Sequence, residues 1–197
     1  MKRQQLIMII GAILVLMGGV SRIVNHEMGW YNFAPITALG LFCGSIFPNK
    51  RYAFLMAIGA QLLGDMYLFF RDGSGFYGLE QLFVYGGLLL VTLLGTFLHK
   101  RKPLTIFGYS IAASLLFFIL SNLGVWVVLM LGKQDVMGYG TGLTALANTY
   151  VAAIPFLERS IVADLLGSAL FFGSFAGIYQ LIQSKKLQLL FAPKKEA

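Results

Sequence analysis

The stretch TIFGYSIAASLLFFILSNLGVWVVLML, residues 105–131, decides the fold class of this chain. It runs for 27 residues without a single charged side chain. A helix needs about 20 mostly apolar residues to cross the roughly 30 Å hydrocarbon core of a bilayer. The stretch therefore predicts a membrane-spanning helix, and the solvent that this part of the chain meets is lipid.

The composition of the whole chain agrees with that interpretation. Of its 197 residues, 58% are hydrophobic and only 12% are charged, against about 25% charged residues in a soluble domain. Five further apolar runs approach the spanning length, at residues 5–23, 33–47, 52–70, 82–98 and 161–182. We predict an all-α polytopic membrane helical bundle of about six transmembrane helices, as one domain over residues 1–184 with a basic cytoplasmic tail at 185–197.

Residues 141–156 leave the number of spans open. They are moderately apolar, but they include Asn148 and end beside Pro155. We interpret them as an interfacial or re-entrant helix. A seventh span is the alternative, and it would place the C-terminus outside the cell.

The distribution of basic residues predicts the orientation. With six spans, eleven of the fifteen basic residues fall in the two termini and in the second and fourth loops. We expect the protein in the inner (plasma) membrane. Lys and Arg are enriched on the cytoplasmic side of membrane proteins, so both termini are expected in the cytoplasm. Membrane topology thus explains the net charge of +7 without nucleic acid as a partner.

Two carboxylates lie inside predicted spans, Asp65 in the third and Asp164 in the last. A charged group at the bilayer centre costs at least ~2.5 to 3.5 kcal/mol, so it needs a partner or a water-filled cavity. Both lie roughly 7 Å from the outer ends of their spans at 1.5 Å per residue. Asn122 and Trp126 lie in the outer part of the fifth span, which suggests a polar pocket for a solute. Arg22, His26 and Glu27 in the first outer loop could cover such a pocket or pair with its carboxylates.

The alternative to a pocket is that these polar groups hold helices together. Asp164 would then lie in the first turn of a helix that begins near Ser160, where the helix macrodipole favours a negative charge. Small residues at helical spacing have the same two interpretations, packing inside the bundle or docking of a partner protein. They are Ala53 and Ala57, Ala60 and Gly64, and Ala169, Gly173 and Gly177.

The sequence contains no metal-ligand spacing, nucleophile elbow or phosphate-binding loop. Each of these motifs carries a recognisable chemistry when it is present. We therefore expect no catalytic residues, no metal and no cofactor.

Several short segments carry a resemblance to a known family. They are NFAPITA at 32–38, Gly64-Asp65, the stretch from Phe117-Phe118 to NLGVW at 122–126, AIPF at 153–156, and Asp164. Together they resemble a family of small bacterial membrane proteins of unassigned function. That family in turn resembles the S components of energy-coupling-factor (ECF) vitamin transporters, which also have six spans.

The S-component resemblance implies a vitamin-binding pocket at the outer ends of the helices. The residues that it would engage are Asn32, Asp65, Asn122, Trp126, Tyr150, Phe156 and Asp164. Such proteins commonly dock an energising membrane partner through an Ala-x-x-x-Ala pattern in the first helix, which is absent here.

Three functions follow from these observations. The leading hypothesis is uptake of a small nutrient, a vitamin or its precursor, with membrane lipids around the protein and an energising membrane protein as a further partner. The second is an intramembrane enzyme that uses Asp65 and Asp164 as an acid and base pair. The third is a structural or assembly subunit that docks a partner through its Gly and Ala residues.

Overall fold

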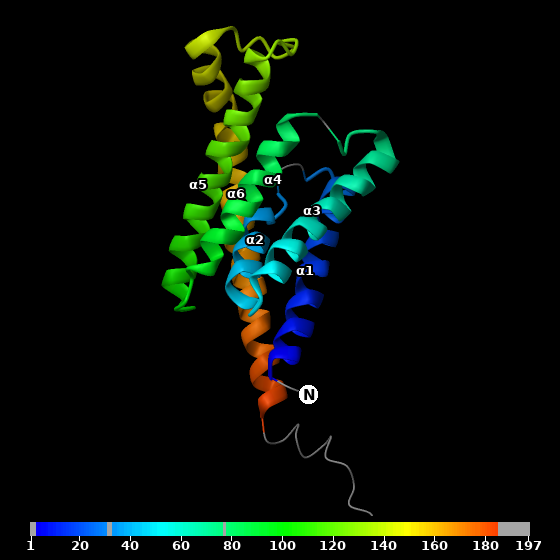
Figure 1. Cartoon of the computed structure of the whole chain (residues 1–197), viewed down its shortest axis with the longest axis vertical. Helices are drawn as coiled ribbons and strands as arrows, with labels where there is room; N and C mark the ends of the chain where they lie inside the picture. The colour runs from blue at the N-terminus through cyan, green and yellow to red at the C-terminus, as the bar shows by residue number, and fades with distance from the viewer. Residues whose placement is uncertain (1–2, 31–32, 77, 185–197) are drawn as a thin grey trace, which may run out of the picture.

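The computed structural model describes residues 3–30, 33–76 and 78–184, and these form six helices. They are α1 (Arg3–Glu27), α2 (Ile36–Ile46), α3 (Lys50–Asp72), α4 (Glu80–Thr96), α5 (Pro103–Met130) and α6 (Gly142–Gln183). The all-helical prediction is confirmed (Figure 1). The predicted basic tail at 185–197 lies outside the described residues.

Four of the helices, α1, α3, α5 and α6, are long and apolar enough to cross a membrane. This length and composition identify a membrane protein. The other two are shorter, with 11 residues in α2 and 17 in α4. At 1.5 Å per residue α2 is only about 16 Å long, roughly half the thickness of the hydrocarbon core.

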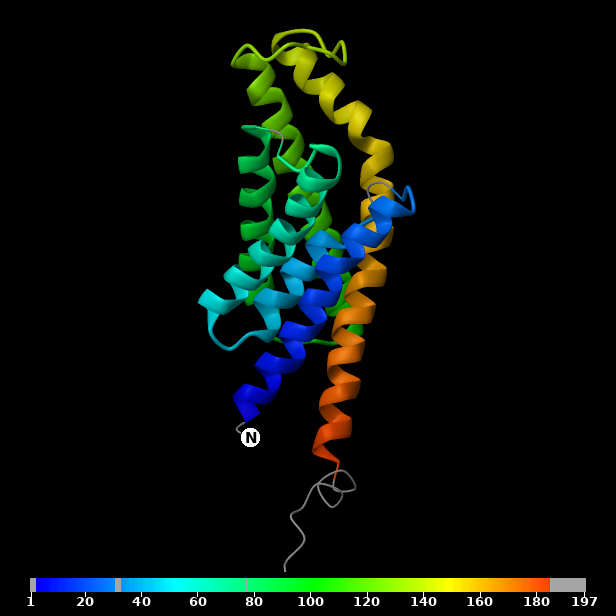
Figure 2. The ribbon, with the colours of Figure 1, turned by 90° about the vertical axis from the view of Figure 1, so that its right-hand side faces the viewer.

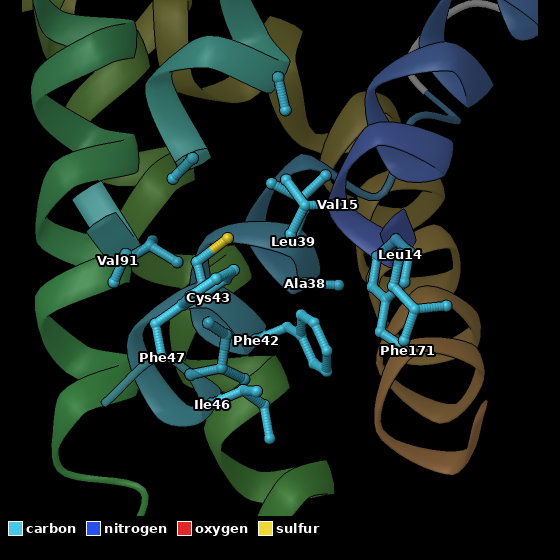
Figure 3. Close-up of a cluster of buried hydrophobic side chains, with 14 of the residues drawn as sticks. Leu14, Val15, Ala38, Leu39, Phe42, Cys43, Ile46, Phe47, Val91 and Phe171 are labelled. Atoms are coloured by element: carbon cyan, nitrogen blue, oxygen red, sulfur yellow. The ribbon is translucent and has the colours of Figure 1, made fainter. Parts of the chain in front are cut away.

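Helix α2 lies at the centre of the bundle, where it contacts each of the other five helices. Every residue from Thr37 to Ile46 is buried, as expected for a helix that is apolar on all sides. Its Phe42 packs against α6, with a ring-centroid distance of 5.8 Å to Phe171 (Figure 3) and an edge-to-face contact with Phe172. The central core is thus built around a helix that is too short to span the bilayer as a helix.

Charged side chains compensate both ends of α2. The backbone N–H of Ala38 in its first turn donates to Asp164 Oδ1 at 3.1 Å. At the other end Lys50 Nζ donates to the carbonyl of Gly44 at 2.8 Å, and Arg101 donates to the carbonyl of Ser45. A negative group at the N-terminus and positive groups at the C-terminus match the helix macrodipole and satisfy backbone groups that the helix leaves free.

Helix α6 corrects two expectations from the sequence. It runs unbroken for 42 residues from Gly142 to Gln183, about 63 Å at 1.5 Å per residue. Residues 142–156 are therefore its first part, and the interpretation as a re-entrant helix is wrong; an interfacial position of this part stays a prediction. A seventh span is also wrong, because the chain does not reverse after Phe156. Pro155 bends the helix without ending it (Figure 2), since a proline removes one backbone donor.

The continuity of α6 also removes the proposed cap near Ser160. Asp164 lies more than twenty residues after the first residue of α6. The macrodipole of its own helix therefore cannot explain this buried carboxylate. The helix end that Asp164 compensates is that of α2.

The two ends of the bundle differ. The start of α1 and the end of α6 lie together at the lower end in Figures 1 and 2, while α5 and the first part of α6 rise above the other helices at the upper end. We use "upper" and "lower" in this sense below. The first residue of α2 faces the upper end and its last residue faces the lower end.

Candidate functional site

A cavity of two adjoining compartments opens at the upper end, and we call it the upper cavity. One compartment, of about 220 Å³, lies between the start of α2, α5 and α6. The other, of about 410 Å³, lies between α1, α3, α4 and α5. Ala34, Ile36, Phe117 and Ser121 line both compartments, so the two adjoin at the entry to α2.

Asp164 forms the base of the smaller compartment. Its side chain comes from α6 and is only 1% exposed. Ser114 of α5 donates to its Oδ2 at 2.8 Å, and the Ala38 N–H donates to its Oδ1. The carboxylate therefore joins α2, α5 and α6 at one point and borders the cavity at the same time.

Two buried polar atoms beside the cavity make no hydrogen bond of good geometry to any residue that the structure describes. They are Thr37 Oγ1 and Gln61 Oε1. Thr37 lines the smaller compartment, beside Asp164, and Gln61 lines the larger. A buried polar atom without a partner costs about 1 to 3 kcal/mol. The Thr37 hydroxyl lies beside the Asp164 carboxylate, and either atom would gain a hydrogen bond from water or a solute once a small shift of the wall exposed it.

Asp65 belongs to a separate network behind the larger compartment. It is fully buried and forms an ion pair with Arg22 of α1, the pairing that the sequence suggested. Tyr85 donates to its Oδ2 at 2.8 Å and Gln81 at 3.2 Å, both from α4, and Gln61 Nε2 lies 3.3 Å from both oxygens. This carboxylate therefore braces α1, α3 and α4.

The remaining predicted site residues divide between the cavity and the protruding part of α5 and α6. Asn122 and Phe156 line the smaller compartment. Trp126 instead donates to the carbonyl of Gly142 at 2.9 Å, and Tyr150 donates to that of Ile119 at 2.7 Å, so both tie α5 to α6. Asn32 lies outside the described residues. Whether any of these side chains binds a solute stays a prediction.

The two carboxylates share no hydrogen-bond partner in the ranges that the structure covers. The sequence placed both at one depth, and each has its own set of helices around it. Nor does any group of three His, Cys, Asp or Glu side chains within those ranges come close enough to hold a metal ion.

Three partners of these carboxylates were not predicted from the sequence: Ser114, Gln81 and Tyr85. Ser114 left a signal, because Ser110 and Ser114 are a helical turn apart in an otherwise apolar span. Ser110 in turn lies 3.0 Å from Ser168 of α6. Two hydroxyls at this spacing predict a helix interface that is joined by hydrogen bonds.

Comparison with known proteins adds one match. No curated protein and no solved structure matches the chain. The model of a family of unknown function, DUF6580, matches residues 2–188, which is nearly the whole length. The chain therefore belongs to the DUF6580 family.

Proposed function

We propose that the protein captures a small nutrient at the outer face of the inner membrane and delivers it to the cytoplasm, in the manner of an S component. The chain would cross the membrane six times, with α2 and its flanking segments as one passage and both termini inside. The clustering of Lys and Arg in the termini and lower loops supports this orientation. In this orientation the upper cavity would open to the outside of the cell.

The observation that carries the proposal is the pair of buried polar atoms beside the upper cavity that make no well-formed hydrogen bond. Small-molecule sites are mostly apolar hollows with a few convergent polar groups. Thr37 Oγ1 and Gln61 Oε1 supply such groups, next to the aromatic side chains of Phe117 and Phe156. A solute that bonds both atoms would span the two compartments.

Side chains at the cavity have separate tasks in this proposal. Thr37, Gln61 and Asn122 orient the solute through hydrogen bonds, and the phenylalanines cover its apolar body. The ion pair of Arg22 and Asp65 holds α1 and α3 in place behind the site. Trp126 and Tyr150 would reach a solute only if the protruding ends of α5 and α6 bent toward the cavity, and release inside would require the bundle to reorient.

The first test is a thermal-shift panel of vitamins and their precursors on the purified protein in detergent, together with native mass spectrometry. A ligand that binds only the folded state raises the melting temperature by mass action. We expect at least one compound to do so, and Thr37→Val to weaken its effect while the unliganded protein remains folded. No retained ligand and no shift with any compound would contradict the proposal.

A partner-docking role has one observation in its favour. A groove of about 640 Å³ in the lower half is lined by α5 and α6, with Ile7 of α1 and Ile46 of α2 also on its wall. Gly173 lines it, and a methyl group added at Gly173 would meet no atom within 4 Å. Close helix approach is typical of such small residues. If an energising or assembly partner docks here, Gly173→Leu should break a complex that copurifies with the protein, whereas Gly108→Leu should leave it intact.

The enzyme hypothesis lacks a comparable observation. It requires Asp65 and Asp164 to act on one substrate as acid and base. Asp65 is enclosed by Arg22, Gln61, Gln81 and Tyr85, and Asp164 borders the cavity in a different set of helices. A shared reaction centre has no geometric basis in this arrangement.

A further inference from the structure

The charges that line the upper cavity are unequally balanced. Arg22 lines the larger compartment and is ion-paired with Asp65. His26, also on that wall, lies 3.2 Å from a carboxylate oxygen of Asp72. Asp164, by contrast, forms no ion pair with any residue that the structure describes.

Only neutral donors and a helix end compensate Asp164. The Ala38 N–H and the Ser114 hydroxyl each give one hydrogen bond, and the hydroxyl and N–H of Thr37 lie beside the carboxylate as further neutral donors. The N-terminus of α2 adds a partial charge of roughly +0.5. No positively charged side chain that the structure describes therefore balances this carboxylate where it borders the cavity.

Aromatic side chains surround the approach to this carboxylate. Phe117, Phe118 and Phe156 line the same compartment of about 220 Å³. The face of an aromatic ring attracts a cation, by about 0.5 to 2 kcal/mol depending on desolvation. A carboxylate at the base of an aromatic-lined compartment is thus complementary to a positive charge attached to an apolar body.

We infer that the solute of the upper cavity is a small organic cation, with an ammonium or amidinium group at Asp164. This inference rests on the proposed function, because it names the chemical class of the solute in the same cavity. The cationic group would pair with the Asp164 carboxylate, and the Thr37 hydroxyl beside it would accept a further hydrogen bond. The apolar body would extend past Ile36 and Phe117 into the larger compartment.

The test compares pairs of probes that match in shape and differ in charge. Benzamidine with benzamide and tryptamine with tryptophol are two such pairs, and their dissociation constants are measured on the purified protein by calorimetry at neutral pH. We expect the cationic member of each pair to bind at least tenfold more tightly than the neutral member.

Two variants isolate the contribution of Asp164. Asp164→Asn keeps an oxygen that accepts from the Ala38 N–H, so the cap on α2 is preserved, and it should abolish the preference for the cation. Glu158→Gln makes the same chemical change at an exposed position of α6 outside the cavity and should leave the preference unchanged. If Asp164→Asn does not fold, the comparison of the two members of each probe pair on the natural protein still tests whether the cavity prefers a cation.

The outcomes separate this inference from the proposed function. Equal binding of the cationic and neutral members would overturn the inference and leave the cavity as a solute site. Tighter binding of the neutral members would do the same. If neither the four probes nor any vitamin in the thermal-shift panel binds, the proposed function itself fails.

Discussion

The close contact between α2 and α4 gives the sharpest prediction about stability, with Gly44→Ala as the perturbation. A Cβ atom built on Gly44 would lie 2.0 Å from the backbone oxygen of Thr92 and 3.0 Å from backbone atoms of Gly95. Both obstacles are backbone, so no side chain can rotate out of the way. The facing Gly95 is equally confined, because its Cβ would lie 2.4 Å from the oxygen of Leu41.

The magnitude follows from the distance. Ordinary contact begins at 3.4 Å, so the two helices must separate locally by about 1.4 Å, and overpacking of this kind costs about 1 to 3 kcal/mol. We expect the upper part of that range, because α2 contacts every other helix and a shift of α2 disturbs all of those contacts. Gly108→Ala in α5 is the matched control, since its methyl group would meet nothing within 4 Å. Alanine also raises helix propensity there by up to about 1 kcal/mol.

The assay is reversible unfolding in mixed micelles with increasing sodium dodecyl sulfate, followed by circular dichroism. Gly44→Ala should unfold at a markedly lower detergent fraction than the natural protein, and Gly108→Ala at an equal or higher one. If Gly44→Ala is as stable as Gly108→Ala, the close approach of α2 and α4 is refuted.

Two further predictions concern charged groups away from α2. Arg22→Met leaves the fully buried Asp65 without its ion-pair partner and should lower the free energy of unfolding by about 3 kcal/mol. Adding Asp65→Asn should restore part of that stability. If the two substitutions lower stability in a strictly additive way in the same unfolding assay, the pairing is contradicted. In the loop after α5, hydrogen bonds from the backbone N–H groups of Gly140 and Tyr139, at 2.7 and 2.9 Å, hold the pKa of Asp135 below its ordinary value. The resulting stabilisation of the loop is present above the ordinary pKa and is lost as the pH falls through the depressed one. At neutral pH, hydrogen exchange of these two amides should therefore be faster in Asp135→Ala than in the natural protein. Below the depressed pKa the two rates should be equal. Equal rates at neutral pH would refute the stabilisation of the loop by ionised Asp135.

The all-helical membrane architecture was predictable from the sequence, because long apolar runs with few charges indicate helices that lie in lipid and not in water. The six apolar runs correspond to the six helices, and Arg22 does pair with a carboxylate, as its position at the outer level suggested. The central place of α2 was not predictable. A buried helix and a lipid-facing helix have the same apolar composition, so the run at 33–47 could not reveal which environment it meets.

The errors have equally specific causes. Pro155 and the polar residues around it suggested a break, whereas α6 continues through the proline with a bend. The depth of Asp65 and Asp164 follows from counting residues along each span. Their separation into two networks depends on the rotation of each helix about its axis and on its neighbours, and a single sequence without a clear amphipathic pattern leaves both undetermined.

The most direct test of the account is the accessibility of the upper cavity from the outside. Cys43 is the only cysteine of the chain and is buried, so Cys43→Ser gives a background for a single Ser121→Cys on the wall that both compartments share. In intact cells, a membrane-impermeant maleimide should label this cysteine, and a bound solute should slow the labelling. Labelling that occurs only from the cytoplasmic side of inverted vesicles, at a rate that no solute changes, would contradict outward-facing capture.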